Sequence, residues 1–228
     1  MAFESILERY DRFVVFDTET TGLDFQRDEI IEFAAVAVEK SGEMRRMDEF
    51  VNLSYGNRVP AFIEQLTGIS DAVLSREGIP KAALCEQIAS FFAGKTLVAA
   101  YNAHFDFSFL YYLLLRQQRT ELLRGVEKLD LLTVYRDRRP YPHKLKDAVA
   151  AYSLAGRVCN SHRAIDDVLA ALAVAEEMEK EKPDLLHYIN LFGYSPKFGI
   201  SGKPIGSVTY RAQGFEPGKP IYEEAAIC

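Results

Sequence analysis

The chain has 228 residues, of which 48% are hydrophobic and 26% are charged, a composition typical of one soluble globular domain with a substantial core. Its formal net charge of −6 argues against a protein that binds nucleic acid passively through a basic surface. No apolar run reaches the about 20 residues that a membrane helix needs, and the acidic start of the chain lacks the apolar core of a secretory signal. We therefore expect a cytoplasmic protein without a membrane segment.

The first part of the chain predicts three strands joined by short turns. Residues 12–16 form a β-branched and aromatic run, residues 30–39 form a longer apolar run, and residues 45–53 alternate loosely, as strands do. Consecutive strands with short connections favour an antiparallel meander.

From residue 60 onward, helices are expected to alternate with strands. The expected helices are 60–66, 70–75, 80–92, 105–116, 143–152 and 164–180, and the expected strands are 96–100 and 129–134. A meander followed by this alternation indicates an α/β fold, in which a mixed sheet is flanked by helices.

The end of the chain differs in composition. Residues 183–228 contain five of the nine prolines and six of the fourteen glycines. We therefore expect one domain over residues 1–182, followed over 183–228 by a short helix at 185–191 and a Gly/Pro-rich tail. The aromatic residues of this tail predict that part of it packs on the domain or on a partner.

The cysteines indicate neither a disulfide framework nor a zinc site. Cys85, Cys159 and Cys228 are far apart and odd in number, whereas both kinds of site need paired or closely spaced cysteines. We expect three free thiols.

Acidic residues follow the first strand on one of its faces. Alternate residues of a strand share a face, so Asp17 and Glu19 extend the face of Phe13 and Val15. Like charges this close repel each other, and burying them without a cation is costly. The simpler alternative is a strand end that has reached water.

A third acid, Asp106, stands in the first turn of the helix that follows strand 96–100. Three apolar residues of that helix share its face, so the carboxylate is expected at the edge of the core. Open α/β sheets place their sites at such strand ends. Alternatively, Asp106 is a first-turn acid favoured by the helix macrodipole.

The last long helix begins with two adjacent acids. Asp167 lies on a stripe that is otherwise apolar and is predicted to face inward, whereas Asp166 is predicted to be solvated. His162 is expected on the loop before the helix, near a cap formed by Asn160 or Ser161. From there it can lean over the same site, although a structural histidine is the alternative.

Together these residues predict four carboxylates and a histidine around one metal site. Oxygen ligands select Mg²⁺ or Mn²⁺ rather than zinc. Two such ions about 3.5–4 Å apart stabilise both the attacking and the leaving oxygen of an in-line phosphoryl displacement. They also lower the pKa of bound water, whose proton a histidine is suited to accept.

Basic and aromatic residues gather between the second and third acidic motifs. They are Arg136, Arg138, Arg139, His143, Lys144 and Lys146, with Tyr135 and Tyr141 between them. Such a mixture suits a single nucleic-acid strand, which it holds through phosphate contacts and base stacking. The alternative is a solvated loop.

Three motifs resemble those of the DEDDh family of 3′→5′ exonucleases. They are FDTETTG at 16–22, NAHFD at 102–106 and HRAIDD at 162–167, and LTGI at 66–69 resembles a smaller signature of the same family. The resemblance covers about residues 10–180 and is closest to the proofreading exonuclease of bacterial DNA polymerase III, either its epsilon subunit or the built-in domain of the Gram-positive-type enzyme.

The resemblance implies an RNase H-like fold and assigns roles to the site residues. It implies that Asp17, Glu19, Asp106 and Asp167 hold two divalent ions, Mg²⁺ or Mn²⁺, with Asp17 bridging them. It implies that His162 is the general base, because Arg163 stands where the sister branch has tyrosine. By analogy, the terminal nucleotide is held by Thr20, Leu66 and Thr67, with support from Asn102 and Phe105.

The implied function is release of nucleoside 5′-monophosphates from single-stranded DNA ends, in proofreading or repair, with a replicative DNA polymerase as partner. Two alternatives stay open. One is an exonuclease of the same family that trims RNA 3′ ends. The other is a non-catalytic module that binds nucleic acid or a partner, which the presence of all four acids and the histidine disfavours.

Overall fold

The computed structural model describes residues 3–158, 162–191, 194–195, 199–200 and 222. Within these residues, five strands form one mixed sheet in the order β3-β2-β1-β4-β5. They are β1 (Arg12–Thr20), β2 (Ile30–Glu39), β3 (Met44–Phe50), β4 (Thr96–Ala100) and β5 (Glu127–Asp130). The predicted meander is present as β1, β2 and β3, and β4 and β5 extend the sheet parallel to β1. The predicted RNase H-like α/β fold is confirmed.

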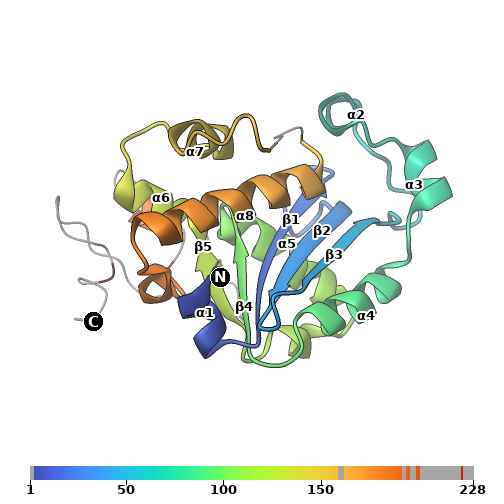
Figure 1. Cartoon of the computed structure of the whole chain (residues 1–228). Helices are drawn as coiled ribbons and strands as arrows, with labels where there is room; N and C mark the ends of the chain where they lie inside the picture. Colours follow the sequence, from blue (N-terminus) through green and yellow to red (C-terminus); the bar gives the residue numbers. More distant parts are fainter. Residues whose placement is uncertain (1–2, 159–161, 192–193, 196–198, 201–221, 223–228) are drawn as a thin grey trace.

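Helices cover both faces of this sheet (Figure 1). The α-helices of the described residues are α1 (Glu4–Arg9), α2 (Ala61–Thr67), α3 (Asp71–Glu77), α4 (Lys81–Phe91), α5 (Ala103–Arg116), α6 (Leu131–Arg138), α7 (Leu145–Ala151) and α8 (Ala164–Glu181). Side chains of α1, α7 and α8 enter the hydrophobic core on one face, and those of α4 and α5 enter the core on the other. No helix in the described part of the chain is long and apolar enough to cross a membrane.

The central strand β1 supplies side chains to both cores. Phe13 and Val15 belong to the core under α8, while Val14 and Phe16 belong to the core under α4 and α5, because successive side chains point to opposite faces. The strand runs to Thr20 instead of ending at residue 16 as predicted. Asp17 and Glu19 therefore lie within the strand, on the side that α8 covers.

The predicted strand at 129–134 is wrong from residue 131 onward. β5 ends at Asp130 and α6 begins at Leu131. The Asp130 carboxylate accepts hydrogen bonds from the backbone N–H of Leu132 at 3.1 Å and from the hydroxyl of Thr133 at 2.6 Å, so it caps the helix. A short apolar run does not by itself distinguish a strand from a buried helix. Helix α1 also has no counterpart among the predicted elements.

After α8 the chain continues into the same core. The helix expected at 185–191 is a 3₁₀ helix over Leu185–Tyr188, and both of its end residues are buried. Two-residue strands β6 (Tyr194–Ser195) and β7 (Gly199–Ile200) pair with each other. Most of the tail lies outside the described residues, so the domain division at 182 stays a prediction. Cys159 and Cys228, two of the three predicted free thiols, also lie outside the described residues. Cys85 is a buried free thiol.

Candidate active site

Two carboxylates lie side by side near the end of β1. Asp17 pairs with Ala34 and Glu19 with Glu32 in the antiparallel register of β1 and β2. Burial, followed by repulsion from Asp106, Asp167 and Glu19, raises the pKa of Asp17 well above its ordinary value. Burial and the charge of Asp167 raise the pKa of Glu19 to about 8. The ionised forms of both side chains are therefore unfavourable in the metal-free protein.

The third acid reaches β1 from helix α5. Asp106 is only 2% exposed, and its Oδ1 accepts hydrogen bonds from the backbone N–H of Thr18 at 3.0 Å and from the Thr18 hydroxyl at 2.8 Å. Burial outweighs these two hydrogen bonds and raises the pKa of Asp106 to about 7. The bonds fix the start of α5 against the strand that carries the first two acids.

A further carboxylate, that of Asp130, binds the first residue of α5 and is not among the site residues predicted from the sequence. Oδ1 of Asp130, at the end of β5, accepts a hydrogen bond from the backbone N–H of Ala103 at 3.0 Å. The preceding Asn102 is in the left-handed conformation at φ 72°. One buried aspartate thus caps α6 and anchors the first residue of α5. Its sequence signal is an acid at the junction between a strand and a helix.

Helix α8 brings the fourth acid and the histidine to the same place. Glu19, His162 and Asp167 each offer one ligand atom, and these atoms lie within 4.8 Å of one another. His162 is exposed and left-handed at φ 59°, immediately before the helix N-cap Arg163. Asn160 and Ser161, predicted near the cap, lie outside the described residues.

The donor set fits a hard divalent cation. Elements from both faces of the sheet aim carboxylates at one region, and burial and repulsion raise the pKa values of Asp17, Glu19 and Asp106. Such a cluster is costly as free anions and becomes favourable when a cation neutralises it. Carboxylate oxygens with one imidazole are ligands that Mg²⁺ and Mn²⁺ accept.

The residues predicted to hold the terminal nucleotide have different environments. The buried Thr20 hydroxyl donates to the carbonyl of Gly22 at 2.6 Å. The buried Thr67 hydroxyl donates to the Ile63 carbonyl at 2.9 Å, at the end of α2. Both hydroxyls therefore shape local turns. The remaining three are Leu66 and Asn102, both exposed, and Phe105, which is half-buried and packs on Phe109.

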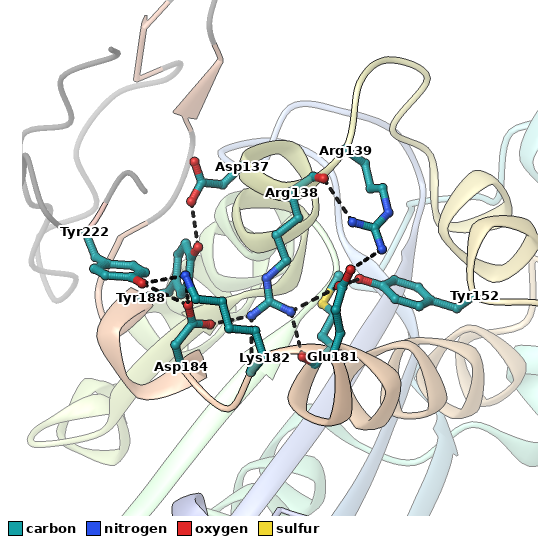
Figure 2. Close-up of polar contacts among 10 residues, drawn as sticks. Asp137, Arg138, Arg139, Tyr152, Glu181, Lys182, Asp184, Tyr188 and Tyr222 are labelled. Carbon is teal, nitrogen blue, oxygen red and sulfur yellow. Dashed lines mark hydrogen bonds and ion pairs between the residues drawn. The ribbon is translucent and has the colours of Figure 1, made fainter. Parts of the chain in front are cut away.

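The structure does not support a strand-binding role for the two central arginines of the basic cluster. Figure 2 shows Arg138 and Arg139 turned toward the end of α8. The Arg138 side chain is 8% exposed and forms an ion pair with Asp184, and it donates to the carbonyls of Met178 at 2.6 Å and Lys182 at 3.1 Å. Arg139 pairs with Glu181. These arginines join the end of α6 to the last turn of α8 and to the residues that follow it.

Comparisons with known proteins agree on a nuclease family. A family model described as "Exonuclease" matches residues 14–175. The "3'-5' exonuclease DinG" of Bacillus subtilis is 41% identical over 102 residues, which cover 44% of this chain and 10% of that protein. The "DNA polymerase III subunit epsilon" of Treponema pallidum is 37% identical over 101 residues, covering 43% of this chain and 44% of that protein.

A longer match covers nearly the whole chain. The "DNA polymerase III PolC-type" of Caldanaerobacter subterraneus is 33% identical over 224 residues, covering 92% of this chain and 15% of that protein. The chain therefore spans less than half the length of these relatives. Among solved structures, E. coli Exonuclease I in complex with a dA16 oligonucleotide superposes with a TM-score of 0.68 at 22% identity, over 78% of this chain and 42% of that one. At this identity the similarity shows the fold alone.

The family match, the fold and the sequence resemblance point the same way. The matched residues 14–175 include β1 from residue 14 to its end, the start of α5 and the first turns of α8, which are the elements that carry the clustered acids. The predicted relationship to the exonucleases of DNA polymerase III is confirmed. The chain belongs to the exonuclease family whose model matches residues 14–175.

Proposed function

We propose that the chain is a divalent-metal-dependent 3′→5′ exonuclease domain that releases nucleoside 5′-monophosphates from single-stranded DNA ends. The observation that carries this proposal is the convergence of acids from β1, α5 and α8 beside His162, with ligand atoms of Glu19, His162 and Asp167 within 4.8 Å of one another. The family membership supports it.

In this proposal, Asp17, Glu19, Asp106 and Asp167 would hold two divalent ions, Mg²⁺ or Mn²⁺, with Asp17 as a ligand that both ions could share. Two such ions, when bound, stabilise the negative charge that develops on the phosphate during an in-line displacement. Thr18 keeps the Asp106 carboxylate oriented through its two hydrogen bonds. The chain thus supplies a rigid oxygen-lined site on the central strand.

His162 acts as the general base. A water oxygen attacks the terminal phosphorus while the bond from phosphorus to the 3′ oxygen of the preceding nucleotide breaks, and His162 accepts the proton of the water. The leaving 3′ oxygen takes a proton from solvent, so the shortened strand ends in a 3′ hydroxyl, and the released nucleoside keeps its 5′ phosphate. Because His162 is exposed, its proton can pass to solvent before the next cycle.

The terminal nucleotide is held by Thr20, Leu66, Thr67, Asn102 and Phe105 in this proposal. Leu66 and Asn102 are exposed and available for direct contact, whereas Thr20 and Thr67 act through the turns that their hydroxyls stabilise. The names of the relatives favour DNA as substrate and a replicative DNA polymerase as partner, in proofreading or repair. RNA trimming is the competing substrate assignment.

The test uses one single-stranded sequence as DNA and as RNA, each labelled at its 5′ end, with Mg²⁺, Mn²⁺ or EDTA. We expect a ladder that shortens from the 3′ end of DNA, is lost in EDTA, and is slowed more than about 100-fold by Glu19→Gln. The matched control is Glu8→Gln, an identical change on the exposed side of α1, which keeps full activity. Cleavage that persists in EDTA contradicts the proposal, and a faster ladder on RNA reassigns the substrate.

A further inference from the structure

A buried carboxylate beside the site has no place in the reaction described above. Glu32 on β2 is 0% exposed and pairs across the sheet with Glu19. Leaving a buried carboxylate without hydrogen bonds is strongly unfavourable, so its partners are informative.

Both oxygens of Glu32 are used to hold the start of α8. Oε1 accepts hydrogen bonds from Nε of Arg163 at 2.9 Å and from its Nη2 at 2.7 Å. Oε2 accepts a hydrogen bond from the backbone N–H of Ala164, the first residue of α8, at 2.9 Å. Arg163 is the helix N-cap but makes no side-chain cap of its own. Glu32 therefore caps α8 from another element, where the helix dipole also favours a negative charge.

The Arg163 side chain is held on a second side as well. Its guanidinium lies 5.0 Å from the ring centroid of Phe50, the last residue of β3. The start of α8 is thus fixed to two neighbouring strands of the sheet. Because the planar guanidinium makes two directed bonds to one carboxylate, it defines an orientation that a lysine cannot reproduce.

The two residues that α8 brings to the site flank this anchor. His162 immediately precedes Arg163, and the backbone N–H of Asp167 donates to the Arg163 carbonyl at 3.1 Å. We propose that Glu32 and Arg163 form a positioning pair that sets His162 and Asp167 over Glu19, the strand partner of Glu32. This inference rests on the proposed exonuclease function and assigns a role to two residues that are not among the proposed metal ligands or nucleotide contacts.

A purely structural role for the pair predicts a different result from a positioning role. A structural role lowers the melting temperature but leaves the kinetics of the folded enzyme unchanged. A positioning role lowers kcat of the folded enzyme while KM for the strand stays nearly constant, because the strand contacts lie on other elements. The kinetic constants are therefore measured well below each variant's melting temperature.

The experiment compares Glu32→Gln and Arg163→Lys with the wild-type chain on single-stranded DNA with Mn²⁺. We expect kcat to fall by about 10–100-fold in each, with KM within about threefold. The kcat of the Glu32→Gln, Arg163→Lys double variant is expected to equal that of the less active single variant, because both changes break the same pair. The control Glu39→Gln, on the same strand, breaks the pair of Glu39 with Arg12 at 3.2 Å and leaves kcat unchanged.

The outcomes separate this inference from the function on which it rests. A wild-type chain that degrades no strand overturns the proposed function. An active wild type whose folded Glu32→Gln and Arg163→Lys variants keep kcat within about threefold overturns the positioning role alone. If Glu32→Gln does not fold, Arg163→Lys decides, since it retains the positive charge beside Glu32.

Discussion

At the scale of single residues, the raised pKa values of the site acids have a consequence for stability. Burial and repulsion raise the pKa of Glu19 from 4.5 to about 8. At a pH between these two values, and without metal, Glu19 is protonated in the folded chain and ionised in the unfolded chain. Folding then takes up a proton, and stability falls as the pH rises through this window. The loss is on the order of a few kcal/mol.

We expect the melting temperature in EDTA to fall between pH 5 and pH 8 more steeply for the wild type than for Glu19→Gln, which has no charge to bury. Mn²⁺ is expected to raise the wild-type melting temperature more at pH 8 than at pH 6, because ligand carboxylates bind metal as anions and release their protons. Thermal melts across this pH range check both expectations. Equal pH dependence in the two proteins, or equal stabilisation by Mn²⁺ at both pH values, contradicts them.

The acids of the site differ in how visible they are in the sequence. Alternation along β1 indicates that Asp17 and Glu19 share a face, and the apolar stripe of α8 distinguishes Asp167 from Asp166. Glu32 is not visible in this way, because it stands in an apolar run that indicates only a strand. Asp130 marks the start of a helix only once β5 is known to end there, because residues 129–134 are predicted as one strand. The partner of Glu32 lies 131 positions away, so only the folded chain reveals its role.

At the scale of elements, the same limit explains the basic cluster. Arg138 and Arg139 look like a nucleic-acid path when only their neighbours in sequence are considered. Their acidic partners, Asp184 and Glu181, lie more than 40 positions later, across α8, where Tyr222 also contacts Asp184 (Figure 2). Local composition therefore predicted a strand-binding surface where the fold makes a junction of ion pairs, buried at Arg138 and Asp184 and partly exposed at Arg139 and Glu181.

Arg138→Ala is expected to lower the free energy of unfolding by about 3 kcal/mol. Asp184 loses one of its two cationic partners and keeps Lys182, and the carbonyls of Met178 and Lys182 lose a charged donor. The salt dependence of strand binding is expected to stay as in the wild type. Denaturant unfolding and binding titrations at several salt concentrations measure the two effects. Arg157→Ala is the control. This exposed arginine pairs with Glu176 and Glu177 of α8, and exposed ion pairs contribute about 0–1 kcal/mol. A stable Arg138→Ala with a flattened salt dependence would restore the strand-binding interpretation.

At the scale of the whole molecule, the site exists because the sheet order brings distant motifs to one strand. β1 lies in the middle of the sheet, α5 and α8 pack on opposite faces, and both begin near the acids of β1. A meander followed by alternating helices and strands predicts the mixed sheet. Periodicity alone does not place β4 beside β1, since that pairing joins segments about 80 positions apart; the motif resemblance supplies it by implying the fold.

The most direct test of a 3′→5′ exonuclease site is the first product released from a single-stranded DNA labelled at its 3′-terminal nucleotide. We expect the label to leave as a nucleoside 5′-monophosphate in the first turnover, only with Mg²⁺ or Mn²⁺, while a 5′-labelled copy shortens by one nucleotide at a time. Release of the label within short oligonucleotides, internal cleavage, or shortening from the 5′ end would contradict the assignment of this site.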